Sequence, residues 1–82
     1  MSFEKASYVF TDKNSLTIFD DEHSDYEDRW ITLGKIKDNS LLVVVYTERV
    51  KNNLQIMRII SARKANKIEI EVYYKQINES MI

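Results

Sequence analysis

The run Leu41-Leu42-Val43-Val44-Val45-Tyr46 decides the fold of this 82-residue chain. It is an unbroken apolar segment rich in β-branched residues, which favours a strand whose two faces are both covered. It is far shorter than the roughly 18 apolar residues of a membrane span. We therefore predict a central strand over residues 41–49, for which the flanking sequence must supply neighbours.

Shorter apolar segments on both sides of this run predict the other strands. These are expected over residues 16–19, 29–37 and 55–62. Proline is absent and Gly34 is the only glycine, so the loops must turn on Asp, Asn and Ser. Asp38-Asn39-Ser40 and Lys51-Asn52-Asn53 fit tight hairpin turns, whereas residues 20–28 form an acidic loop. Short connections of this kind predict an antiparallel meander.

A helix is expected at each end of the chain. Ser2 can cap a first helix over residues 3–12, with Phe3, Ala6 and Phe10 on one face. A second helix is expected over residues 64–78. The whole chain therefore reads as one α+β domain, residues 1–82, with an antiparallel four-stranded sheet and an N-terminal and a C-terminal helix.

The second helix carries two apolar stripes. One comprises Ala65, Ile68 and Val72, and the other comprises Ile70, Tyr74, Ile77 and Met81. One stripe can dock on the sheet, and the other is then available to a partner chain or to a second copy of this chain. A C-terminus with a few exposed apolar side chains is the alternative.

Composition removes several classes of function. The chain has no cysteine, so a disulfide framework, a thiolate metal site and a cysteine nucleophile are excluded. Nothing at the N-terminus is typical of a signal peptide, and we expect a cytoplasmic protein that has no membrane partner.

Charge is distributed unevenly along the chain, with 8 acids and 3 bases in residues 1–34 and 5 acids and 9 bases in residues 35–82. The basic half could meet phosphates, although an ordinary solvated surface explains the same balance.

Several side chains could act on a phosphate. His23 has an unperturbed pKa near neutrality and sits in the acidic loop, where it could transfer a proton or simply pair with neighbouring acids. Arginines can hold a phosphate bidentately and stabilise charge that develops during attack. The candidates are Arg29, Arg49, Arg58 and Arg63. Each could instead pair with a local carboxylate such as Glu48 or Glu69. Tyr73, on the last helix, could stack on an exposed base.

Two blocks of the sequence carry a family resemblance. The first comprises Ser2-Phe3-Glu4-Lys5-Ala6, Val9-Phe10, Asp20, His23, Glu27-Asp28-Arg29 and Ile31-Thr32-Leu33-Gly34. The second comprises Leu42-Val43-Val44-Val45, Thr47, Arg49, Arg58-Ile59-Ile60-Ser61-Ala62-Arg63, Ala65, Glu69 and Tyr73. Together they resemble the BrnT family of toxins from type II toxin–antitoxin systems.

The resemblance implies a RelE-like fold and a ribonuclease that works without a metal or another cofactor and inhibits translation. It further implies neutralisation by a BrnA-like antitoxin, with operator DNA bound only through the toxin–antitoxin complex. The site residues it implies are Arg49 and Arg63 at the phosphate, His23 or Glu27 for proton transfer, and Arg29, Arg58, Lys64 and Tyr73 as RNA contacts.

One departure from the family concerns the N-terminus. Family members carry a strand and a helix, ending in a Lys-His-Gly element, before the equivalent of Ser2. Without them we expect an open sheet edge and a homo-oligomer that covers it. The alternative function is a catalytically inactive relative that binds the antitoxin or associates with itself.

Overall fold

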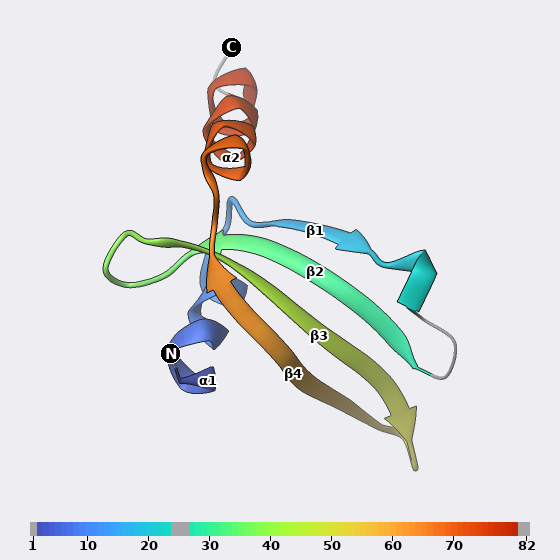
Figure 1. Cartoon of the computed structure of the whole chain (residues 1–82). Coiled ribbons are helices and arrows are strands. Elements are labelled where there is room, and N and C mark those ends of the chain that lie inside the picture. Colours follow the sequence, from blue (N-terminus) through green and yellow to red (C-terminus); the bar gives the residue numbers. More distant parts are fainter. Residues whose placement is uncertain (1, 24–26, 81–82) are drawn as a thin grey trace.

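The computed structural model of the chain describes residues 2–23 and 27–80, the side chains of His23 and Ser80 excepted. Figure 1 shows a curved sheet, with the C-terminal helix leaving one end and the N-terminal helical segment lying against one face near that end. In chain order the elements are α1 (Phe3–Ala6), η1 (Ser7–Thr11), β1 (Leu16–Phe19), η2 (Asp21–His23), β2 (Asp28–Lys35), β3 (Leu41–Lys51), β4 (Leu54–Lys64) and α2 (Lys67–Ser80).

The four strands form one antiparallel meander in the order β1-β2-β3-β4. This confirms the predicted α+β fold with a helix at each end. The hairpin turns use the residues that the sequence indicated, because Asn39, Asn52 and Asn53 all have positive φ values of 68°, 53° and 66°. Asparagine tolerates this left-handed conformation better than most residues do. The Asn52-Asn53 loop therefore suits the two-residue turn between the long strands β3 and β4.

The N-terminal helical segment covers one face of the sheet and builds the core. Ser2 caps it as predicted, since the Lys5 backbone N–H donates to Ser2 Oγ at 3.1 Å. The segment tightens from α1 into the 3₁₀ helix η1, whose three-residue repeat puts Ala6 and Val9 on the same side. Both are fully buried, whereas Phe3 is 58% exposed, so Phe3 and Ala6, which were predicted to share one face, differ in burial.

The strand side of this core comes from alternate residues of β3. Leu42, Val44 and Tyr46 cluster with Ala6 and Val9. The only glycine makes this contact possible: a Cβ at Gly34 would lie 2.9 Å from Val9 Cβ and 3.0 Å from the Val9 carbonyl oxygen. A side chain at this position would push η1 away from β2.

The opposite face of the sheet is covered only in part. Val43 is buried there, at a shallow apolar depression of about 190 Å³. Its lining residues are Leu16, Ile18, Ile31, Leu33, Val43, Glu69 and Val72. Farther along β3 the same face carries the exposed Arg49. The prediction that the central strand is covered on both faces therefore holds near Val43 and fails at the other end.

The C-terminal helix leaves the end of the sheet instead of lying across it (Figure 1). Neither predicted stripe docks as a unit, because Ile68, Val72 and Tyr74 remain 71%, 49% and 41% exposed. The side chain that α2 buries is Tyr73, at 1% exposure. Met81, the last member of the second stripe, falls outside the described residues. No helix in the described part of the chain is long and apolar enough to cross a membrane.

Candidate functional site

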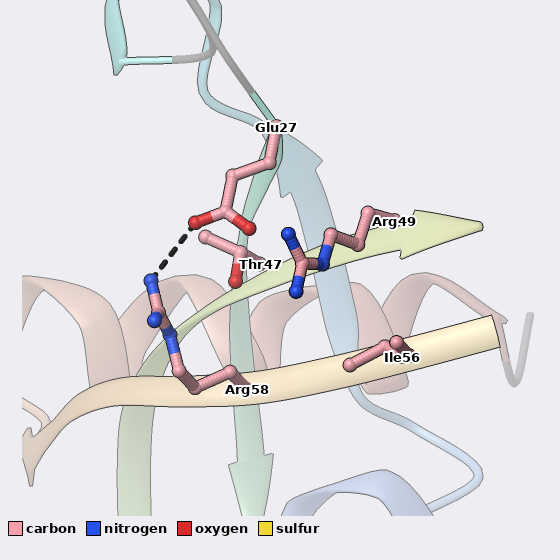
Figure 2. Close-up of a pocket in the computed structure, with 5 residues that line it drawn as sticks. All are labelled: Glu27, Thr47, Arg49, Ile56 and Arg58. Carbon is pink, nitrogen blue, oxygen red and sulfur yellow. Dashed lines mark hydrogen bonds and ion pairs between the residues drawn. The ribbon is translucent and has the colours of Figure 1, made fainter. Parts of the chain in front are cut away.

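A charged pocket of about 250 Å³ opens at the end of the sheet far from α2. Its lining residues are Glu27, Thr47, Arg49, Ile56 and Arg58. Figure 2 shows the Glu27 carboxylate pointing between the two guanidinium groups, which come from neighbouring strands. The site thus combines two cations and one carboxylate on a rigid β scaffold.

Strand register explains why these side chains meet. In the pairing of β3 with β4, Thr47 lies opposite Arg58 and Arg49 lies opposite Ile56. Residues that pair in a sheet project to the same face, so all four side chains point into the pocket. Glu27 is the residue just before β2, and its side chain reaches the pocket from there. The first pair between β2 and β3 is Asp28 with Glu48.

A β-bulge selects which face of β4 reaches the pocket. Val45 pairs with Ser61 but Tyr46 pairs with Ile59, which leaves Ile60 as the extra residue. Without this insertion Arg58 would share the face of Glu48 and point away from Arg49. The bulge also interrupts the simple alternation of faces along β4, because Arg58 and Ser61 share a face.

The two arginines of the pocket differ in their partners. Arg58 Nη2 donates to Glu27 Oε1 at 2.9 Å, and the Arg58 side chain is 70% exposed while that of Glu27 is 26% exposed. Arg49 is exposed and has no hydrogen-bond or ion-pair partner within residues 2–23 and 27–80. Among the described residues, one arginine of the pocket is thus held by a carboxylate and the other is not, and the second positive charge suits an anionic ligand.

Arg29 lies beside this pocket. It is half-buried on β2 and pairs with Thr47 in register, so it projects to the same face as Arg49 and Arg58. It makes interactions of its own with the rest of the structure. His23 ends η2, and its side chain falls outside the described residues, so the predicted proton-transfer role stays a prediction.

The structure does not bring Arg63 and Arg49 together. Arg63 pairs with Val43, six residues before Arg49 on β3, which corresponds to about 20 Å along the strand. The two cannot hold one phosphate, contrary to the expectation from the sequence. Arg63 is instead bound bidentately to Glu69, with both N–O distances at 2.8 Å.

This ion pair belongs to the start of α2. The Glu69 Oε1 atom also accepts from the Asn66 backbone N–H at 2.8 Å, and Asn66 Oδ1 accepts from the Glu69 backbone N–H at 2.9 Å. The pair forms a capping box in which asparagine replaces the usual serine or threonine. The hydrogen bond from Arg63 lowers the pKa of Glu69, and Glu69 raises the pKa of Arg63. Arg63 therefore fixes the helix, which is the alternative that its local carboxylate had suggested.

Two further predicted RNA contacts lie at this structural end. Tyr73 is buried and its hydroxyl donates to Asp12 Oδ2 at 2.6 Å, so its ring is not available to stack on a base. This corrects the predicted role. Lys64 is exposed but pairs with Leu42, on the face and at the end opposite to the pocket.

Sequence reasoning missed three residues of these sites. Thr47 and Ile56 line the pocket, but their place depends on register and on the bulge, which no local pattern signals. Asp12 accepts hydrogen bonds from Tyr73, from Asn14 N–H at 3.0 Å and from Lys35 N–H at 2.8 Å. The Tyr73 partner is 61 residues away, so its role could not be read from the neighbouring sequence.

Comparison with known families gives one clear result. A family model described as "Ribonuclease toxin, BrnT, of type II toxin-antitoxin system" matches residues 1–69. The matched region contains every residue of the pocket and all four strands. No curated protein sequence matches the chain.

Proposed function

The chain belongs to the BrnT family of ribonuclease toxins from type II toxin–antitoxin systems, and we propose that it cuts RNA at the pocket of Glu27, Arg49 and Arg58. The observation that supports this location is the guanidinium of Arg49, which has no carboxylate partner among the described residues, beside the Glu27–Arg58 pair. Membership of a toxin–antitoxin family implies an antitoxin partner.

Phosphate binding is the first task of the pocket. Arg49 contacts oxygens on one side of the scissile phosphate. The Arg58 side chain turns away from Glu27 and contacts the oxygens on the other side. This exchange has a low cost because the Glu27–Arg58 pair is largely solvent-exposed on the arginine side. As negative charge builds on the phosphorus oxygens during attack, both guanidinium groups stabilise it more strongly than they stabilise the ground state.

Proton transfer is the second task. Release of Arg58 to the phosphate frees the Glu27 carboxylate to accept the proton of the ribose 2′-hydroxyl. The 2′-oxygen then forms a bond to phosphorus, the bond from phosphorus to the 5′-oxygen breaks, and that oxygen takes a proton from water, to which Glu27 later returns the proton it accepted. The products are a 2′,3′-cyclic phosphate and a 5′-hydroxyl end. This route needs only residues of the chain and water, in line with the metal-free mechanism proposed from the resemblance.

The wider biology is part of the same proposal. The neutralising partner is a BrnA-like antitoxin, operator DNA is bound only through that complex, and RNA cleavage in the cytoplasm inhibits translation. Exposed apolar side chains on α2, such as Ile68 and Val72, support the further proposal of a homo-oligomer.

The test is cleavage of a fluorescent single-stranded RNA by the purified chain in the presence of EDTA. Arg49→Ala should lower the rate about 100- to 1,000-fold, the usual cost of removing one donor that stabilises transition-state charge. Arg63→Ala is the matched control and should cleave at the rate of the unmodified chain. End-group analysis should find the cyclic phosphate.

Two results would contradict the proposal. Equal loss of activity in both arginine variants, each shown to be folded by circular dichroism, would remove the pocket as the site. Absence of cleavage by the unmodified chain, together with unimpaired growth of bacteria expressing it, would favour the alternative of an inactive antitoxin-binding relative.

A further inference from the structure

The end of β3 and all of β4 form a segment with charge of one sign. Residues 49–64, here called the basic hairpin, contain Arg49, Lys51, Arg58, Arg63 and Lys64 and no acidic residue. The chain as a whole has a net charge of −1. The positive charge is therefore concentrated in this hairpin, which indicates an acidic partner.

The hairpin also presents an unpaired strand edge. In the sheet order β1-β2-β3-β4, strand β4 is terminal and spans 11 residues. Within the described part of the chain, β4 pairs with β3 alone. Figure 1 shows its outer edge running along the border of the sheet. A long edge of this kind offers backbone N–H and C=O groups to another strand.

Apolar side chains lie among the charges of this edge. Leu54, Met57 and Ile60 are 68%, 48% and 37% exposed. A nucleic acid backbone would neutralise the cations but leave the unpaired peptide groups and these apolar side chains uncovered. An extended peptide would satisfy all three features, since its backbone pairs with the edge while its side chains alternate between the two faces.

A second copy of this chain is a poor occupant of the edge. Strand β4 carries Arg58, Arg63 and Lys64 and no acid, so pairing it with itself places like charges on neighbouring strands. An acidic strand reverses the sign of every such contact.

We propose that the outer edge of β4 binds an extended peptide segment in which carboxylate side chains alternate with apolar ones. Carboxylates on the pocket face would lie near Arg58, and apolar side chains on the other face would cover Met57. This inference rests on the proposed function for the identity of its partner, because the antitoxin is the protein expected to supply such a segment. It assigns that partner a defined docking strand, and a segment placed beside Arg58 would exclude RNA from the pocket.

The experiment uses a synthetic probe, the fluorescein-labelled, capped decapeptide (Glu-Val)₅, with (Lys-Val)₅ as its matched control. Binding to the full chain is measured by fluorescence anisotropy, and its place is mapped by backbone amide exchange. We expect (Glu-Val)₅ to bind and to slow exchange of β4 amides, with affinity that falls as salt rises, and (Lys-Val)₅ to fail.

Matched charge reversals locate the contact. Arg58→Glu reverses a charge of β4 on the pocket face, whereas Lys75→Glu makes the same kind of change on the exposed surface of α2. The first should weaken binding of (Glu-Val)₅ about fivefold and the second should leave it unchanged, because only the first charge faces the added strand. Equal effects of the two variants would overturn the assignment to β4.

The outcomes separate this inference from ribonuclease activity. Failure of (Glu-Val)₅ to bind, with a single-stranded RNA decamer binding and being cleaved, would overturn the docking strand and leave the proposed function intact. Protection of β4 by the peptide without any RNA cleavage would support the docking strand and remove the enzymatic proposal. Exchange protection on α2 instead of β4 would also overturn the inference.

Discussion

The two ends of the sheet use arginine in opposite ways. At the end near α2, Arg63 is held by both carboxylate oxygens of Glu69, which also caps the helix. At the other end, Arg58 has a single contact with Glu27, and Arg49 has none within the described residues. The same residue type is thus fixed in one place and available in the other. Availability to a ligand depends on whether the fold supplies a carboxylate with matching geometry.

The α2 end is further locked by a polar cluster around Asp12. Burial opposes ionisation of this carboxyl, but hydrogen bonds from Tyr73 and from the Asn14 and Lys35 backbones outweigh it and lower the pKa of Asp12. Burial and the same hydrogen bond raise the pKa of Tyr73 well above its ordinary value. Gln76 adds a bond of 2.7 Å to the Asn14 carbonyl oxygen. These contacts attach a helix whose apolar residues are mostly exposed.

Of the substitutions that test this comparison, the largest effect is expected at the pocket end of the sheet. Glu27→Gln keeps the size of the side chain but removes its ability to accept a proton, so RNA cleavage should fall about 100- to 10,000-fold. Glu48→Gln is the matched control, since Glu48 pairs with Met57 on the other face of the sheet, and it should retain full activity. Cleavage rates measured at saturating RNA report on this step. Full activity of Glu27→Gln would show that the carboxylate only orders Arg58.

The next effect concerns stability at the opposite end. Tyr73→Phe removes a hydroxyl that donates to a carboxylate at 2.6 Å and should lower the free energy of unfolding by about 2 kcal/mol. For a domain of this size that loss corresponds to about 10 °C in Tm. Tyr74→Phe makes the same change on an exposed neighbour and should lower the free energy of unfolding only slightly. Similar Tm values for the two variants would mean that the Asp12 cluster does not anchor α2.

The sequence predicted the fold well because its signals are local. The apolar run at residues 41–46 placed the central strand, and Asn39, Asn52 and Asn53 placed the turns through their tolerance of positive φ. The sequence predicted the helix α2 but not its packing, because the docking of a stripe was inferred from helical periodicity alone. That periodicity does not specify that α2 leaves the end of the sheet, where Tyr73 is the one fully buried side chain among the described side chains of the helix.

The charged members of the candidate pocket were identified from the sequence, but their grouping was not. Arg49, Arg58 and Glu27 were all identified from the sequence, but so were Arg63, Lys64 and Tyr73, which lie at the other end. Their separation follows from register, and the face of Arg58 follows from the extra residue Ile60. Both are properties of paired strands, which a single-sequence pattern does not contain.

The smallest expected effect sharpens the contrast between the two kinds of arginine. Arg63→Ala should lower the free energy of unfolding by only about 0.5 kcal/mol at pH 7, because the Arg63 side chain is 57% exposed and solvent screens the pair. The measurement is urea unfolding of both proteins from pH 7 down to pH 3.

The dependence on pH identifies the cause. The pKa of Glu69 is lower in the folded chain than its ordinary value of 4.5, so its pairing with Arg63 contributes fully above that value. The contribution is lost as the pH falls through the folded pKa and the carboxyl gains its proton. The difference between the two proteins should therefore shrink in acid. A difference that stayed constant from pH 7 to pH 3 would assign the effect to packing of the arginine stem, and Arg63 would then differ from Arg49 for a reason other than its carboxylate partner.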